Sequence, residues 1–298
     1  MLVLVAPGQG AQTPGFLTPW LELPGLADRL SAWSDVAGLD LIAYGTTADA
    51  DEIKDTAVAQ PLLVAASLAA AEALGASPDL LAGHSVGEFA AAALAGVITA
   101  EQALGLVRER GLAMAKSAAV TATGMTAVLG GAEDEVLAAL TAHGLTPANI
   151  NGAGQIVAGG TLEQLTALKE EPPARARLIP LAVAGAFHTD HMAPAVSQLR
   201  VSAAAITPSD PSVKLLSNAD GQVVGSGAEA VERMIKQVSN PVRWDACMAT
   251  MAELGVTKMI ELLPGGTLTG LAKRGLRGVE TVALKTPDDL DAARELIK

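Results

Sequence analysis

The sequence predicts an α/β fold that is built on a mostly parallel sheet and carries a smaller subdomain inserted near the middle of the chain. In the first part of the chain, short apolar segments that read as strands alternate with segments that read as helices. This alternation is typical of a parallel sheet covered by helices on both faces. Further along, the order changes to strand, helix, strand, strand, helix, strand, which indicates a separate compact unit.

Composition limits the class of protein. A chain of 298 residues can bury a large core, and one that is 50% hydrophobic and 17% charged is not disordered. The formal net charge of −12 repels nucleic acid, and aromatic residues at 2% offer few platforms for stacking bases. We therefore expect a globular protein with no nucleic-acid partner.

Three features bear on location. Cys247 is the only cysteine, which indicates a reducing compartment and excludes an internal disulfide. The apolar segment Leu2–Ala6 lacks a preceding basic residue and soon meets Pro7, so it reads as a strand and not as a signal peptide. The longest apolar run, 61–71, is shorter than the ~20 residues that cross a bilayer. We expect a cytoplasmic monomer with no membrane attachment.

The elements of the main sheet follow from these patterns. Leu2–Ala6 is the first strand and leads into a Gly-rich loop at 7–12. An Ala-rich helix is predicted over 60–74, with Pro61 at its first position, where a missing N–H costs nothing. The remaining predicted elements of the main sheet and its helices are a strand at 79–82, helices at 88–95 and 100–117, helices at 193–205, 228–238 and 245–254, and a strand at 258–261.

The central unit is predicted to be a ferredoxin-like subdomain spanning 125–184. Its order, βαββαβ, is that of the split-βαβ motif. The two flanking segments, 1–124 and 185–298, then form the larger catalytic subdomain. The predicted elements of the unit are strands at 125–129, 146–151, 155–158 and 177–181, and helices at 133–143 and 161–169.

A candidate nucleophile lies between a predicted strand and a predicted helix. Residues 83–87 read Gly-His-Ser-Val-Gly, the strand–turn–helix context that a nucleophile elbow requires. The flanking glycines permit a tight, strained turn, and the amides that begin the next helix can hold negative charge beside Ser85. The alternative is a Gly-rich loop with a capping serine.

A serine nucleophile needs a base, and the chain has four histidines. His84 adjoins Ser85 along a sharp turn, so its ring should point elsewhere, and His143 ends a polar helix. His188 and His191 both follow the central unit, where the chain returns to the main sheet. Spacing alone leaves either of them as the base, and each could instead be a hydrogen-bonded loop histidine.

Short segments along the whole chain resemble one family, the malonyl-CoA:acyl carrier protein transacylases and the related acyltransferase domains of polyketide synthases. The resemblance implies an α/β-hydrolase-like core with a ferredoxin-like insert. The segments are Pro-Gly-Gln-Gly-Ala-Gln at 7–12, Gln-Pro at 60–61, Gly-His-Ser-Val-Gly-Glu at 83–88, Arg-Gly at 110–111, Phe-His at 187–188, Asn-Pro-Val-Arg-Trp at 240–244 and Pro-Gly-Gly-Thr-Leu at 264–268.

The resemblance also implies roles for individual residues. Ser85 would be the nucleophile and His188 the general base and acid, which leaves His191 without a role. The backbone N–H groups of Gln9 and Val86 would form the oxyanion hole. The backbone carbonyl of Gln237 would orient the histidine, in place of the aspartate of a triad.

Substrate recognition is implied for three further residues. By sequence alone an arginine at 110 reads as a solvated helix charge, but the family uses it to grip a free carboxylate through its planar fork. Arg108, on the same helix, is not expected to have this role. Gln60 would line the substrate pocket, or it would cap a helix. Phe187 would favour malonyl over methylmalonyl, and a difference of one methyl group is worth about 1–3 kcal/mol of binding free energy. Asn151 and Gln155 are weaker candidates.

The function implied is transfer of malonyl from malonyl-CoA to the phosphopantetheine thiol of acyl carrier protein through a malonyl-serine. No cofactor is expected to stay bound, and no metal site is expected because the histidines lack ligand spacing. An esterase or thioesterase is the main alternative, although the triad histidine of such a hydrolase normally comes late in the chain and no histidine follows His191. A catalytically silent scaffold that binds carrier protein is a second alternative. The sequence does not distinguish an enzyme that supplies malonyl to fatty-acid synthesis from one that supplies it to polyketide synthesis. Candidates for a basic docking patch are Lys116, Lys273, Arg274 and Arg277.

Overall fold

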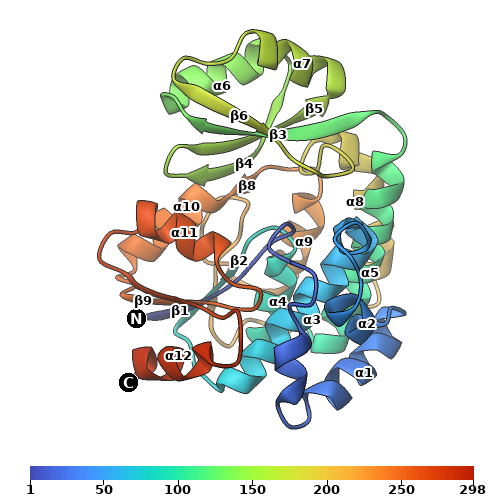
Figure 1. Cartoon of the computed structure of the whole chain (residues 1–298), viewed down its shortest axis with the longest axis vertical. Helices are drawn as coiled ribbons and strands as arrows, with labels where there is room; N and C mark the ends of the chain where they lie inside the picture. The colour runs from blue at the N-terminus through green and yellow to red at the C-terminus, as the bar shows by residue number, and fades with distance from the viewer.

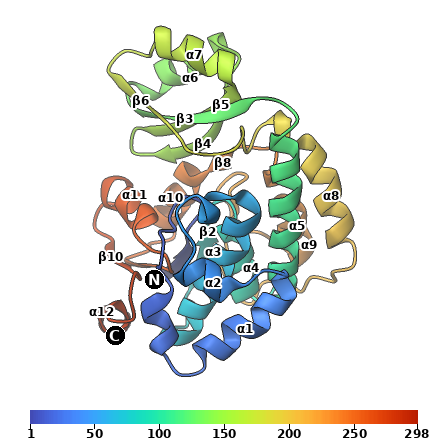
Figure 2. The same ribbon diagram turned by 45° about the vertical axis from the view of Figure 1, so that its right-hand side comes forward.

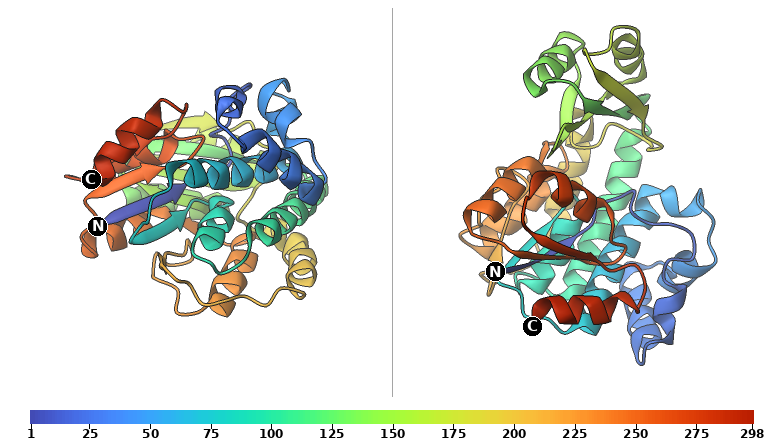
Figure 3. Two further views of the ribbon diagram at one scale, coloured as in Figure 1. Left: turned by 90° about the horizontal axis from the view of Figure 1, so that it is seen from below. Right: turned by 60° about the vertical axis from the view of Figure 1, so that its left-hand side comes forward.

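The structure is a computed structural model that describes all residues from Met1 to Lys298. It contains two five-stranded sheets. Figure 1 shows the second sheet, with helices α6 (Glu133–Ala142) and α7 (Leu162–Glu170) on its outer side, standing over the larger part of the molecule. Both chain ends lie in the larger part (Figure 3). The mixed α/β class predicted from the sequence is confirmed.

The main sheet is parallel throughout, with the strand order β10-β9-β1-β2-β7. Its central strand β1 (Leu2–Ala6) is buried along its whole length, as expected for a strand covered on both faces. A short final strand, β10, pairs with β9 at one edge. The other strands are β2 (Leu80–Gly83), β7 (Lys214–Leu215), β9 (Lys258–Glu261) and β10 (Glu280–Ala283).

Alternate side chains of β1 enter different cores. Leu2 and Leu4 belong to a large cluster that includes α3, α4 and α5, whereas Val3 and Val5 join a smaller cluster with α10 and α11. This alternation follows from the two-residue period of a strand. The helices of the larger part are α1 (Leu26–Ala37), α2 (Leu41–Thr46), α3 (Thr56–Leu74), α4 (Gly87–Leu94), α5 (Ala100–Ala118), α8 (Ala193–Ala203), α9 (Gly227–Gln237), α10 (Trp244–Glu253), α11 (Thr267–Gly275) and α12 (Asp289–Ile297).

Helix α3 begins earlier than the sequence predicts. It starts at Thr56, after the capping carboxylate of Asp55, so Pro61 lies inside the helix and not at its first position. Proline cannot donate to the carbonyl four residues back, here that of Ala57. Arg108 of α5 donates to this carbonyl at 2.9 Å. The prediction was wrong because a partner distant in sequence satisfies the carbonyl that Pro61 leaves free.

Helices α3 and α5 approach closely near the contact between Arg108 and Ala57. A Cβ added to Gly111 would lie 2.8 Å from the carbonyl oxygen of Thr56. Helix α3 is long and apolar enough to cross a membrane, but 89% of its apolar window is buried within the fold. It is therefore a core helix of this molecule, and α5, which packs against it, runs up to the second sheet (Figure 2).

The second sheet has the strand order β6-β3-β5-β4-β8. The element order β3, α6, β4, β5, α7, β6 is the order βαββαβ expected from the sequence. β8 comes from outside the predicted 125–184 unit and pairs in parallel with β4, which links the two parts of the molecule. The strands are β3 (Thr123–Gly130), β4 (Thr146–Gly152), β5 (Gln155–Thr161), β6 (Ala176–Pro180) and β8 (Val242–Arg243).

The contact between Arg108 and α3 gives a stability prediction. We expect Arg108→Met, which keeps an apolar stem but loses the donor, to lower the free energy of unfolding by about 1–2 kcal/mol. Pro61→Ala returns an N–H that can donate to Ala57, so it should recover part of this loss in the Arg108→Met background. Urea unfolding of the four proteins of this cycle measures the coupling, and strictly additive effects would contradict it.

Candidate active site

The turn that carries Ser85 is forced by close backbone packing. A Cβ on Gly83 would lie 2.0 Å from the carbonyl carbon of Gly87, and one on Gly87 would lie 2.3 Å from the carbonyl oxygen of Ala6. Neither glycine has a positive φ; Ser85 does, at 53°. The two glycines permit the tight turn that the sequence predicts because no side chain would fit at either position. The left-handed conformation costs Ser85 about 1–3 kcal/mol.

Ser85 and His188 are in hydrogen-bond contact although 103 residues separate them. The Ser85 Oγ lies 2.7 Å from Nε2 of His188. The Nδ1 of His188 lies 2.8 Å from the carbonyl oxygen of Gln237, an acceptor that requires the hydrogen to be on Nδ1. Nε2 is then free to accept the hydroxyl proton of Ser85. The family resemblance implied this contact for the carbonyl of Gln237.

The imidazole of His188 is held in its neutral form. Burial, together with the nearby positive charge of Arg110, lowers the pKa of His188 to about 3. Only 3% of His188 is exposed. A neutral imidazole with an open Nε2 is the state that a general base needs at neutral pH.

None of the other histidines hydrogen bonds to Ser85. The Nε2 of His84 donates to Oδ1 of Asn151 at 2.9 Å, and its ring packs edge-on against Trp244. Burial lowers the pKa of His84 as well. His191 lies on a short turn after His188, and His143 ends α6 on the second sheet. Neither forms a side-chain hydrogen bond with Ser85.

Two backbone N–H groups beside Ser85 have no acceptor within the protein. They belong to Gln9, in the loop after β1, and to Val86, directly after the serine, and both residues line the same cavity. The side chain of Gln9 is engaged elsewhere, with Thr56 at 3.3 Å. Free N–H groups at this position fit the oxyanion hole that the sequence predicts.

Arg110 is buried without a carboxylate partner. It is 1% exposed and forms no ion pair; it donates to Oε1 of Gln60 at 2.7 Å, Oε1 of Gln237 at 2.9 Å and Oγ of Ser85 at 3.4 Å. Its Nε has no partner. A guanidinium has five N–H donors, so these three contacts leave two donors, one of them on Nε, open to an incoming carboxylate. Burial lowers the pKa of Arg110 to about 10, so it stays charged at neutral pH.

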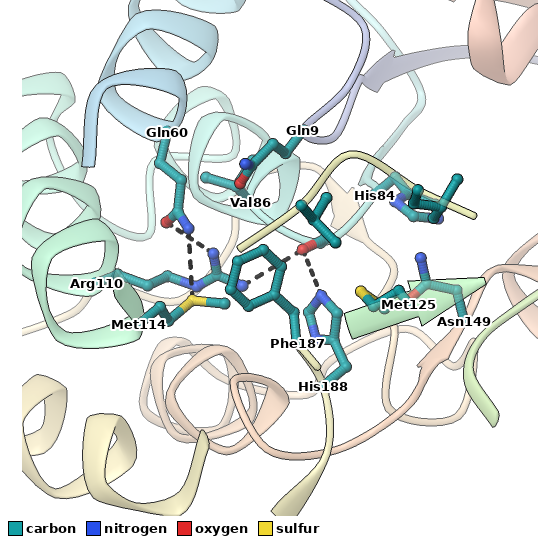
Figure 4. A pocket seen from close by; sticks show the side chains of 13 residues that line it. Gln9, Gln60, His84, Val86, Arg110, Met114, Met125, Asn149, Phe187 and His188 are labelled. Atoms are coloured by element: carbon teal, nitrogen blue, oxygen red, sulfur yellow. Dashed lines mark hydrogen bonds between the residues drawn. The ribbon is translucent and has the colours of Figure 1, made fainter. Parts of the chain in front are cut away.

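The cavity at Ser85 is small and lies between the two sheets. Its volume is about 70 Å³. Figure 4 shows Arg110 and His188 converging on it from different elements, with Phe187 between them. Gln60 is 1% exposed and lies inside α3, whose N-cap is Asp55, so its alternative role as a helix cap is excluded. The remaining Gln60 hydrogen bond, from Nε2, goes to Sδ of Met114 at 3.4 Å.

Some predicted residues lie elsewhere, and others were missed. Asn151 bonds His84, and Gln155 faces Arg274 at 3.5 Å; neither lines the cavity. Asn149 does line it, with an Oδ1 that has no partner. Its position two residues before Asn151 places it on the same face of β4, which is the one signal that could have found it. The sequence also gave no role to Met114, Met125, Glu88 or Asn218.

The basic residues considered for docking do not form one patch. Lys116 lies near the end of α5, whereas Lys273 and Arg274 end α11. Figures 1 and 2 show α5 and α11 on opposite sides of the larger part of the molecule. Lys116 therefore does not lie beside the basic residues of α11.

Comparisons with known proteins identify similar sequences and structures. The model of the acyl transferase domain family matches residues 3–288. The malonyl CoA-acyl carrier protein transacylase of Mycobacterium tuberculosis is 54% identical over 302 residues, which cover 99% of this chain and 100% of that protein. The crystal structure of MCAT from Mycobacterium tuberculosis matches with a TM-score of 0.96 and 54% identity over 100% of both chains. A malonyl-transacylase solved with its type II PKS acyl-carrier protein matches with a TM-score of 0.92 and 32% identity over 99% of each chain.

The environment of His188 predicts its protonation state. Because burial disfavours the imidazolium, His188 should remain a neutral Nδ1–H tautomer between about pH 5 and 8. Nitrogen NMR of histidine-labelled protein measures this, and the His188→Gln variant identifies the signal. A titration midpoint near the ordinary value of 6.5 would contradict the depressed pKa.

Proposed function

The chain belongs to the acyl transferase family and within it to the malonyl CoA-acyl carrier protein transacylases, and on this premise we propose that Ser85 carries malonyl from malonyl-CoA to the phosphopantetheine thiol of acyl carrier protein. The observation that carries the proposal is a buried arginine without a carboxylate partner whose Nη2 lies 3.4 Å from the nucleophile candidate. A malonyl thioester supplies both groups that this pair fits: a carbonyl for Ser85 and a free carboxylate for Arg110.

The first half of the reaction forms the acyl-enzyme. His188 Nε2 takes the hydroxyl proton as Ser85 Oγ attacks the thioester carbonyl. The N–H groups of Gln9 and Val86 hold the developing oxyanion, and one such donor contributes roughly 2.7–4 kcal/mol. The carbon–sulfur bond then breaks, and coenzyme A leaves as a thiol with the proton from His188. Malonyl stays on Ser85 as an ester.

The second half reverses these steps with another thiol. The phosphopantetheine thiol of the carrier protein gives its proton to His188 and attacks the malonyl ester. Ser85 leaves and recovers its proton from His188, so the enzyme is regenerated. The Gln237 carbonyl holds the imidazole in one tautomer throughout, although it stabilises imidazolium less than a carboxylate would.

Selection of a short acyl group follows from the walls of the cavity. Phe187, Met114 and Met125 line the space beside Ser85, whose volume of about 70 Å³ admits few non-hydrogen atoms. Burial of Arg110 favours an acyl group that ends in a carboxylate, since an uncharged chain would leave the guanidinium unpaired. Crowding by Phe187 disfavours an added methyl branch.

The same proposal fixes the remaining requirements of the enzyme. Both substrates bind in turn and leave, so the reaction needs no permanently bound cofactor and no metal. A single copy of the chain holds every residue that the scheme uses, and we propose that it acts as a cytoplasmic monomer. Acyl carrier protein is its macromolecular partner.

The covalent step can be tested directly. On mixing with malonyl-CoA and no acceptor, the protein should gain one malonyl group, and Ser85→Ala should gain none. Intact-mass measurement detects the adduct, and added carrier protein should remove it. Steady release of free malonate without an adduct would point to a thioesterase, and the absence of both would point to a non-catalytic scaffold.

The role of Arg110 predicts a change in selectivity. Arg110→Ala should lose about 3–5 kcal/mol of transition-state stabilisation with malonyl-CoA, the cost of removing one partner of a buried ion pair. Transfer from acetyl-CoA, which has no carboxylate, should fall far less. Arg108→Ala on the same helix is the matched control and should keep the ratio of the two kcat/KM values. Equal losses with both substrates in Arg110→Ala would refute the carboxylate contact.

A further inference from the structure

A second buried charge lies behind the nucleophile, on the carboxylate of Glu88. This residue follows Ser85 by three positions, begins the otherwise apolar helix α4 and is 4% exposed. Its Oε1 accepts from the backbone N–H of Asn218 at 2.6 Å, and its Oε2 accepts from Nε2 of Gln237. Both partners are donors, so the contacts suit an ionised carboxylate and leave no acceptor for a carboxyl proton.

The side-chain amide of Gln237 connects Glu88 to the site. Its Nε2 faces acceptors only: Glu88, the Oδ1 of Asn218 at 3.1 Å and the carbonyl oxygen of Ser85 at 3.2 Å. Its Oε1 accepts from Nη2 of Arg110 at 2.9 Å. If the amide turned over, its NH₂ would face the guanidinium, and its oxygen would face the carboxylate. Glu88, with these two neutral oxygens, therefore sets which end of the amide Arg110 meets, and it is the only carboxylate among the three acceptors.

The same amide keeps two opposite charges apart. Neither Glu88 nor Arg110 forms an ion pair, and Gln237 hydrogen bonds to both. Burial raises the pKa of Glu88 above its ordinary value, whereas the Asn218 N–H and the charges of Arg110 and Arg233 lower it and so favour the carboxylate that the two donors on its oxygens require. The negative charge of Glu88 thus depends on these donors, while Arg110 stays open to a carboxylate from outside.

We propose that Glu88 is a positioning residue for malonyl transfer: acting through the Gln237 amide, it holds Arg110 toward Ser85 and unpaired with any carboxylate of the protein. This inference rests on the proposed function. Glu88 touches neither Ser85 Oγ nor the cavity that holds the substrate. Its loss should therefore change the recognition of the malonyl carboxylate more than the chemistry at the serine.

The test is the ratio of kcat/KM for malonyl-CoA to that for acetyl-CoA. Glu88→Gln replaces the acceptor with a group that can donate, so the Gln237 amide should turn its oxygen toward residue 88 and its NH₂ toward Arg110. We expect the ratio to fall roughly tenfold, the effect of one hydrogen bond to a charged group. Glu88→Asp keeps the charge and should retain more of the ratio than Glu88→Gln.

Glu261→Gln is the matched control. Glu261 is also a fully buried carboxylate that accepts three backbone N–H groups at the start of α11, away from the cavity. We expect this variant to lose stability and to keep the wild-type ratio. If Glu88→Gln lowers both activities equally, as a purely structural residue would, the proposal is overturned.

A single variant of Gln237 keeps the test decisive if Glu88→Gln folds poorly, and it overturns the proposal if it keeps the wild-type ratio. Gln237→Leu removes the amide but keeps the backbone carbonyl that orients His188. It should lower the ratio as Glu88→Gln does, and adding Glu88→Gln should change the ratio little further because both act on one path. Full additivity would overturn the proposal. A wild-type protein that forms no malonyl adduct would instead refute the proposed function itself.

Discussion

The structure depends on how tightly three backbone segments meet at the end of β2. The loop after β1, the turn at Ser85 and the start of α4 come so close that Gly83 and Gly87 have no room for a side chain. This contact forces Ser85 into a left-handed conformation and projects its hydroxyl into the cavity. Asn218 supports the turn, since its side chain accepts from the Ser85 N–H at 2.7 Å and donates to the Gly83 carbonyl at 2.7 Å. Strain at the nucleophile is thus offset by hydrogen bonds from a distant segment.

A buried cation is the second constraint. Taking Arg110 out of water costs several kcal/mol, and the protein offsets this with neutral amide oxygens from Gln60 and Gln237 and with the ring of Phe89, 5.7 Å away. A carboxylate in direct contact would stabilise the folded protein more but would occupy the donors that a substrate needs. The arrangement therefore favours recognition of an external carboxylate over maximal stability.

The cavity exists because the two sheets are joined above the nucleophile. β8 extends the second sheet from a segment that belongs to the larger part of the chain, and His84 next to Ser85 bonds Asn151 on β4. Asn149 and Met125 of the second sheet consequently line the space beside Ser85, together with loop and helix residues of the larger part. The size of this space is set by the contact between the sheets, and a rearrangement there would alter access to the serine.

The sequence by itself determined the alternation of strands and helices, the strand–turn–helix around Ser85 and the βαββαβ order, because local apolar periodicity and glycine placement act over a few residues. Family motifs further directed attention to His188, Arg110 and Gln237. Tertiary structure alone decided the start of α3 and the task of Arg108, the choice of Asn149 over Asn151 in the cavity, and the links from Glu88 through Gln237. Each of these depends on hydrogen bonds between groups tens to hundreds of residues apart, and no local pattern records which buried donor will meet which acceptor.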